Sequence, residues 1–181
     1  MKIFIDTEFT DLWSPELMSV GFAAECGARL YVEVAPDPSG NRGWVPSRCS
    51  RFVKDSVIPL LQGGGFACSR AEAATRTLAW LENFPRAIEM VADSAVDFHL
   101  LHDLWAGRLP RNLLGEHVEA PARHRQPAGA SAARFRRHHA LDDALALLSA
   151  CQSRVSPREI ESARVETPQF ETPQFETAAL L

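Results

Sequence analysis

The start of the chain contains short apolar runs, which cover residues 2–7, 17–24 and 29–35. Short apolar runs bounded by polar or turn-forming residues are typical of buried strands. The turn residues 25–27, Glu-Cys-Gly, separate the second run from the third, and such a short connection with glycine indicates a hairpin. We therefore expect the chain to begin as an antiparallel meander.

Longer segments carry apolar residues at helical spacing and predict helices at residues 50–61, 69–84, 93–105 and 140–153. In the first, one face carries Phe52, Val53, Val57, Leu60 and Leu61. Ser69 and Glu72 form a capping-box pattern at the start of the second. Further strands are expected at residues 87–92 and 113–118. The pattern predicts an α/β fold, with a mixed central sheet that starts as an antiparallel meander and is flanked by helices.

The last part of the chain has a different composition. The five-residue sequence Glu-Thr-Pro-Gln-Phe occurs twice in succession, at residues 166–170 and 171–175. A short repeat with proline in each copy does not build a packed core. We expect one domain at residues 1–153 and a disordered tail at residues 154–181. A partner-binding motif around Phe170 and Phe175 is the alternative.

Composition changes this picture little, because a formal net charge of -4 neither favours nor excludes a nucleic-acid partner. No apolar run approaches the roughly 20 residues that a membrane span needs. The cysteines stand singly, without the paired spacing of a metal site, as is typical of a reducing compartment. These features predict a cytoplasmic protein without a membrane partner.

Candidate chemistry begins at Asp6 and Glu8, at the end of the first apolar run. Side chains at positions i and i+2 of a strand point to the same face. Two carboxylates that share a face repel each other unless a proton or a cation lies between them. Hard oxygen ligands favour Mg²⁺ or Mn²⁺. A solvated strand end is the alternative for this pair.

Two further blocks contain acidic residues where helices are expected to start. Asp93 and Asp97 follow the strand predicted at residues 87–92, where Asp93 as a helix cap and Asp97 as a surface residue is the alternative. Near the end of the domain, two histidines precede a helix whose first turn carries Asp142 and Asp143. Acids favour the positive end of a helix dipole, which is the alternative explanation for these aspartates.

The three blocks together resemble the DEDDh branch of the DnaQ-like 3′-5′ exonucleases. The matching stretches are Ile5-Asp6-Thr7-Glu8-Phe9-Thr10, Ala92-Asp93-Ser94-Ala95-Val96-Asp97-Phe98-His99-Leu100-Leu101 and His138-His139-Ala140-Leu141-Asp142-Asp143-Ala144. Within that superfamily the chain is most similar to the small bacterial exoribonucleases of the RNase AS type, which open with a similar D-T-E-F. The middle block departs from the His-Asn-x-x-Phe-Asp of many relatives.

The resemblance implies a ribonuclease H-like fold and a site for two Mg²⁺ or Mn²⁺ ions. In that site Asp6 bridges both ions, and Glu8 and Asp143 complete the position of the more strongly held one. Asp97 acts directly or through water. The family register makes His138 the general base, a task that suits a group with an ordinary pKa of about 6.5.

Helical geometry alone would select a different histidine, because His139 and Asp143 are four residues apart and share a helix face. His138 is five residues from Asp143, about 500° of helical turn, so the two side chains converge only if His138 precedes the helix on a loop. We retain His139 as the alternative. Asp142 is expected to cap or support the helix start.

The resemblance also implies where nucleic acid lies. The 3′-terminal nucleotide is expected near Thr7, Phe9 and Thr10, with Phe9 either stacked on the terminal base or packed in the core. Arginines gather before His138, and Arg136 and Arg137 are expected to contact phosphates. A solvated basic loop is the alternative for that stretch.

We therefore predict a two-metal 3′-5′ exonuclease that acts on single-stranded or 3′-overhang nucleic acid, with RNA favoured. A DNA exonuclease of the proofreading or repair type is the alternative within the same enzyme class. A nucleic-acid-binding module without activity, and coincidental surface acids on an unrelated α/β domain, are the alternatives from other classes. A homodimer is expected only by analogy with relatives.

Overall fold

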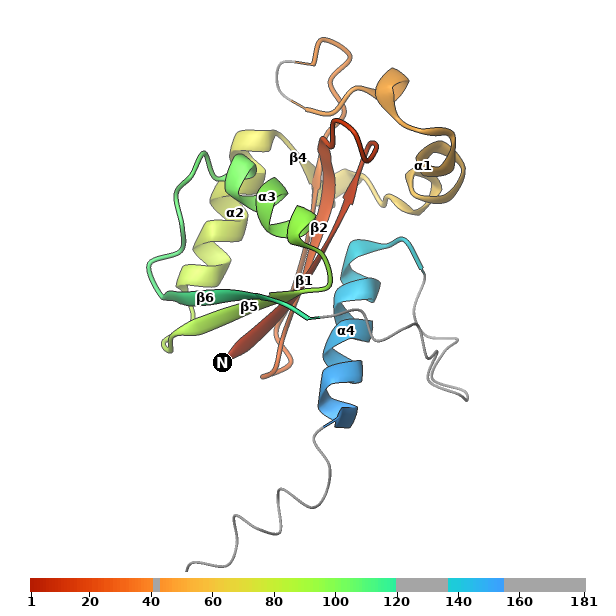
Figure 1. The fold of residues 1–181 in the computed structure, drawn as a ribbon. Coiled ribbons are helices and arrows are strands. Elements are labelled where there is room, and N and C mark those ends of the chain that lie inside the picture. The colour runs from red at the N-terminus through yellow and green to blue at the C-terminus, as the bar shows by residue number, and fades with distance from the viewer. Residues whose placement is uncertain (41–42, 120–136, 155–181) are drawn as a thin grey trace, which may run out of the picture.

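The computed structural model describes residues 1–40, 43–119 and 137–154, and it forms an α/β fold around one six-stranded sheet (Figure 1). The strand order is β4-β3-β2-β1-β5-β6. The strands are β1 (Lys2–Phe9), β2 (Leu17–Ala24), β3 (Arg29–Val34), β4 (Ala67–Cys68), β5 (Ile88–Ala92) and β6 (Leu113–Val118). Strands β1, β2 and β3 pair antiparallel, whereas β4, β5 and β6 join parallel to their neighbours. The predicted antiparallel start and mixed sheet are thus confirmed.

Helices cover both faces of this sheet (Figure 1). The α-helices are α1 (Arg51–Ser56), α2 (Arg70–Glu82), α3 (Ala95–Leu104) and α4 (Ala140–Arg154), and the 3-10 turns are η1 (Pro46–Arg48), η2 (Ile58–Leu60) and η3 (Gly64–Phe66). Alternate residues of β1 point to opposite faces, as expected for a strand. Ile3 and Ile5 join the large core that contains residues of α2 and α3, whereas Phe4 packs with Ala144 of α4. The same alternation directs Asp6 and Glu8 toward α4.

The helix predicted at residues 50–61 is wrong in its extent. Helix α1 ends at Ser56, and the separate turn η2 follows it with Pro59 inside. Proline lacks the N–H that would continue the helical hydrogen bonds, and its ring clashes with the preceding turn. Phe52, which the pattern places on the apolar face, is 55% exposed. The two-residue strand β4 was not predicted, because so short an element has no periodicity to detect.

Other predicted boundaries agree closely with the structure. Ser69 caps α2 by accepting a hydrogen bond from the backbone N of Glu72. The side chain of Glu72 binds Arg76 on the next turn, so the pattern forms one half of a capping box. Within the described ranges no helix is long and apolar enough to cross a membrane. Apart from Arg154 at the end of α4, the predicted tail lies outside the described residues.

Gly21 fixes how closely α4 approaches the sheet. It is the β2 residue that pairs with Asp6 of β1, and it faces the first turn of α4. A Cβ atom at this position would lie 2.3 Å from the backbone N of Leu141. Real non-bonded atoms do not approach so closely, so any side chain at residue 21 would displace the start of α4. The helix start can lie beside Asp6 because residue 21 is glycine.

We expect Gly21→Ala to destabilise the fold by about 1–3 kcal/mol, because the new methyl group overlaps backbone that cannot move independently. Chemical denaturation followed by circular dichroism measures this change. Gly65→Ala is the matched control, since nothing lies within 4 Å of a Cβ built there. Its effect is expected to stay within about 0.5 kcal/mol. Equal effects of the two substitutions would refute the proposed close approach.

Candidate metal centre

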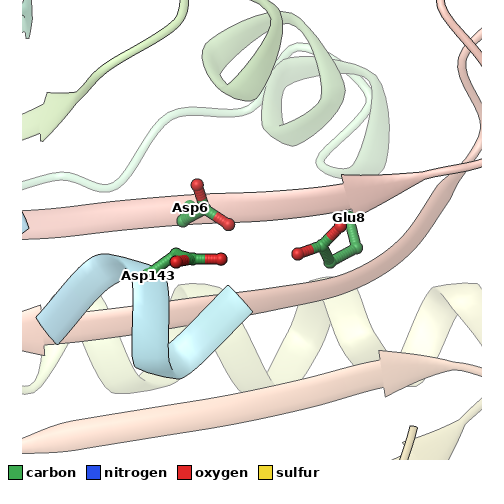
Figure 2. A group of neighbouring side chains, drawn as sticks. All are labelled: Asp6, Glu8 and Asp143. Atoms are coloured by element: carbon green, nitrogen blue, oxygen red, sulfur yellow. The ribbon is translucent and has the colours of Figure 1, made fainter. Parts of the chain in front are cut away.

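Three carboxylates converge where β1 meets the start of α4. Asp6 and Glu8 lie on one face of β1, and Asp143 comes from the first turn of α4 (Figure 2). Each residue offers one oxygen, and these oxygens lie within 4.8 Å of one another. In Figure 2 the carboxylates of Glu8 and Asp143 point toward each other across a short space beside Asp6. These residues can therefore share one cation.

Asp143 is held in place by the loop that precedes α4. Its carboxylate accepts a hydrogen bond from the backbone N of His138, at 2.8 Å. His138 has a φ angle of 64°, in the left-handed region, and the helix begins two residues later at Ala140. The chain therefore turns sharply at His138. The sequence prediction that His138 and Asp143 can meet only across a loop agrees with this geometry.

A second group of carboxylates also includes Asp6 and consists of Asp6, Asp93 and Asp97. Their ligand oxygens also lie within 4.8 Å of one another. Asp6 is the member common to both groups. A carboxylate that belongs to two such groups has the oxygen atoms needed to contribute to both.

Asp97 reaches the site because β1 extends beyond its neighbour β5. The pairing of β1 with β5 includes Phe4 and Val91 but does not extend to Thr7. The Oδ1 atom of Asp97 accepts hydrogen bonds from the backbone N of Thr7, at 3.1 Å, and from its hydroxyl, at 2.5 Å. Asp97 is only 2% exposed, so the alternative that it is a surface residue is wrong.

The other oxygen of Asp97, Oδ2, is buried and has no hydrogen-bond partner among the described residues. Leaving a buried carboxylate oxygen unpaired costs free energy, so a partner is expected for it. Asp97 and its neighbouring carboxylates make the second group suitable for a hard divalent cation. The oxygen ligands of the two groups that share Asp6 therefore fit Mg²⁺ or Mn²⁺.

Asp93 is the candidate ligand that sequence reasoning missed. The alternative considered for it was a helix cap, but the cap of α3 is Ser94, whose side chain accepts from the backbone N of Val96 at 3.2 Å. A signal was available in the sequence, because Asp93 directly follows a strand end and stands four residues before Asp97. Residues at that spacing lie on one side of a helix start.

The crowded carboxylates raise one another's pKa values. Burial, followed by repulsion from Asp143 and Asp97, raises the pKa of Glu8 to about 8. Burial also raises the pKa of Asp97 to about 6, against the opposing hydrogen bond from Thr7. The pKa of Asp6 is raised well above its ordinary range by burial and by its acidic neighbours, and burial raises that of Asp143. The metal-free site therefore retains protons that a bound cation would displace.

Comparison with known proteins assigns no family. No protein-family model matches the chain. No curated protein matches it either. The function is therefore inferred from the residues of the site and their arrangement.

The two histidines of the C-terminal block have different surroundings. His138 lines a pocket together with Glu8, and the ring of Phe52 meets it edge-on with centroids 4.9 Å apart. His139 is 2% exposed and stacks on Tyr31, with centroids 4.5 Å apart. These contacts give His139 a packing role, whereas His138 lies on the wall of a pocket.

The pocket beside the carboxylates has a volume of about 450 Å³. Glu8 and His138 form part of its wall, and most of the remaining lining is apolar: Phe9, Leu12, Trp13, Phe52, Val53 and Val57. Leu12 and Trp13 are 82% and 97% exposed. The carboxylate of Asp11 accepts the backbone N–H groups of Trp13 and Ser14, at 2.7 and 2.8 Å, and so fixes the turn that presents them. An apolar surface therefore adjoins the acidic one.

The structure separates the residues predicted to bind substrate. Phe9 is half-buried and lines the pocket. Thr7 and Thr10 are 5% and 0% exposed, and the hydroxyl of Thr7 is used by Asp97, so both are better explained as structural residues than as substrate contacts. Arg137 is exposed immediately before His138. Arg136 lies outside the described residues.

The raised pKa values predict how stability depends on pH. Between the ordinary Glu pKa of 4.5 and about 8, folded Glu8 holds a proton that the unfolded chain has released. The free energy of unfolding of the metal-free protein is therefore expected to fall as the pH rises through this interval. Added Mn²⁺ should reverse the loss at the upper end, because a cation replaces the proton.

Thermal unfolding with chelator and with Mn²⁺, at about pH 5 and about pH 8, measures both effects. Glu8→Gln is the matched variant and is expected to reduce the pH dependence, since its side chain cannot ionise. Metal-free stability that is equal at both pH values, or that rises with pH in this interval, would contradict the assigned repulsion.

Proposed function

We propose that this protein is a divalent-metal-dependent 3′-5′ exonuclease of the DEDDh type with a ribonuclease H-like fold, and that it hydrolyses single-stranded or 3′-overhang nucleic acid, with RNA preferred. The observation that carries the proposal is the position of Asp6, which belongs to both groups of carboxylates. A shared carboxylate between two oxygen-ligand sets supports a site for two ions, and such sites are typical of phosphodiester hydrolysis.

The residues divide the work as follows. Glu8 and Asp143 would hold one Mg²⁺ or Mn²⁺ ion with Asp6, and Asp97 would hold the second ion with Asp6. Two ions bound there would lower the pKa of the attacking water and stabilise the negative charge that develops on the phosphate. Thr7 fixes Asp97 through two hydrogen bonds, so it positions a ligand and does not itself touch the substrate.

His138 is proposed to accept the proton of the attacking water. Its side chain lies on the wall of the pocket that Glu8 also lines, and its backbone N is bonded to the carboxylate of Asp143. That hydrogen bond ties the position of the proposed base to the position of a proposed metal ligand. General bases placed in this way typically contribute about 10²- to 10⁴-fold to a rate.

The apolar side of the pocket supports a nucleotide as the ligand. A nucleotide carries an anionic phosphate at one end and a flat base at the other. This matches a pocket lined both by Glu8 of the proposed metal centre and by apolar side chains. Phe9 and Trp13 offer aromatic rings for the terminal base, and stacking on an aromatic side chain tolerates every base. RNA preference rests on the resemblance of the motifs, and the homodimer expected by analogy stays a prediction.

The activity is tested with 5′-labelled single-stranded RNA and DNA oligonucleotides, in Mg²⁺ or Mn²⁺ and then in chelator. We expect metal-dependent stepwise shortening from the 3′ end, faster on RNA. His138→Ala is expected to lower the rate about 10²- to 10⁴-fold while the protein still binds Mn²⁺. His117→Ala, at an exposed histidine of β6, is the control and should keep full activity.

Other outcomes select other functions. Shortening of DNA alone would transfer the proposal to a DNA exonuclease. Retained binding of both nucleic acids without cleavage in either metal would indicate a binding module and contradict the enzymatic role. Equal losses of cleavage rate in His138→Ala and His117→Ala would contradict the assignment of His138 as the general base.

Trp13→Ala tests the apolar half of the pocket. We expect KM for oligonucleotides to rise by the equivalent of about 1–3 kcal/mol, the usual value of base stacking on an aromatic side chain. Hydrolysis of bis(p-nitrophenyl) phosphate, which has no nucleobase, should be unchanged. Leu114→Ala removes an exposed apolar side chain of β6, outside the pocket lining, and is the matched control. An unchanged KM for Trp13→Ala would exclude base stacking at this residue.

A further inference from the structure

Asp93 is an acidic residue for which neither the proposed catalysis nor the fold has provided a role. It lies between the end of β5 at Ala92 and the start of α3 at Ala95, and it is partly exposed. Ser94 performs the capping of α3. Within the described ranges no Lys, Arg or His side chain forms a salt bridge with Asp93. Its negative charge raises the pKa values of Asp6 and Asp97, after the larger effect of burial, so it opposes their ionisation in the metal-free protein.

A second, independent observation indicates that these carboxylates serve a ligand. Asp97 is only 2% exposed, and its Oδ2 atom has no hydrogen-bond partner among the described residues. Thr7 uses only Oδ1. The unused oxygen belongs to the residue that shares a cluster with Asp6 and Asp93, with ligand atoms within 4.8 Å. A cation bound by all three carboxylates would provide the missing partner and remove the repulsion.

We propose that Asp93 is a metal ligand, and that Asp6, Asp93 and Asp97 form a three-carboxylate site that holds a divalent cation before nucleic acid binds. The inference rests on the proposed two-ion function and adds a ligand to it. Mg²⁺ is usually held in proteins by one or two carboxylates together with substrate phosphates. A third carboxylate supplies negative charge that a phosphate otherwise brings, so this ion does not depend on the substrate for binding.

The charge of the whole site agrees with this assignment. Without Asp93, the ionised carboxylates of the site balance the charge of two divalent cations. These carboxylates are Asp6, Glu8, Asp97 and Asp143. Asp93 adds one further negative charge next to the second cation. The excess favours retention of both ions in the free protein and costs repulsion when the ions are removed.

The test measures Mn²⁺ binding to the full-length protein without nucleic acid, by electron paramagnetic resonance of free Mn²⁺ and by calorimetry. We expect two bound ions per chain in the unmodified protein. Asp93→Asn should leave one site at its original affinity and weaken the other by at least about 10- to 100-fold, the loss typical when a group that only supports a metal ligand is removed. Asp103→Asn, at an aspartate of α3 that pairs with Arg70, is the control and should leave both sites unchanged.

Failure of this inference can be distinguished from failure of the proposed function. Two ions bound with equal affinity by Asp93→Asn and by the unmodified protein would overturn the role of Asp93 and leave the nuclease proposal intact. Binding of only one ion by the unmodified protein would also overturn it. Absence of any Mn²⁺ binding, together with absence of cleavage, would overturn both. Thermal unfolding in chelator shows whether weaker Mn²⁺ binding by Asp93→Asn results from loss of the fold. The thermal midpoint of the variant is expected to equal or exceed that of the unmodified protein, because the substitution removes a repulsive charge.

Discussion

The close approach between Gly21 of β2 and the first turn of α4 is the constraint on which the site depends. Asp6 is paired with Gly21 across two strands, so the helix that packs on this glycine also brings Asp143 to Asp6. The loop before the helix carries His138. Its backbone N donates a hydrogen bond to the carboxylate of Asp143, so the position of His138 also depends on the position of the helix start. Because residue 21 has no Cβ atom, Asp143 of the C-terminal motif can lie beside Asp6 of the N-terminal motif.

The cost of this arrangement is electrostatic. Burial and mutual repulsion raise the pKa values of Asp6, Glu8 and Asp97, and a buried oxygen of Asp97 lacks a partner among the described residues. Such a concentration of acid opposes folding when it is ionised and has no compensating cation. Unfavourable groups of this kind persist in proteins where they serve binding or catalysis. Among the described residues, the carboxyl groups with clearly raised pKa values lie at the proposed metal centre, whereas the core around α2 and α3 is apolar.

Much of this architecture could be predicted from the sequence, because the spacing of apolar residues indicates which positions of a strand or helix are buried. The strands β1, β2 and β3 and the helix α2 were found in this way. Helix α1 was predicted too long because the apolar pattern continued past Pro59, which interrupts the helical hydrogen bonds. Two-residue β4 leaves no periodic signal. Phe52 follows the apolar pattern of a buried face but is 55% exposed and lines the pocket. The pattern does not distinguish an apolar residue of the core from one that lines a pocket.

The candidate site was predicted less completely than the fold. Asp6 and Glu8 were paired from strand geometry, but Asp93 was missed because capping explained it equally well until Ser94 was seen in that role. The measurement that most directly tests the central claim is anomalous diffraction from crystals soaked in Mn²⁺. The account predicts two peaks, one on each side of the Asp6 carboxylate, the first beside Glu8 and Asp143 and the second beside Asp97. Absence of both peaks, or Mn²⁺ bound only away from Asp6, would contradict it.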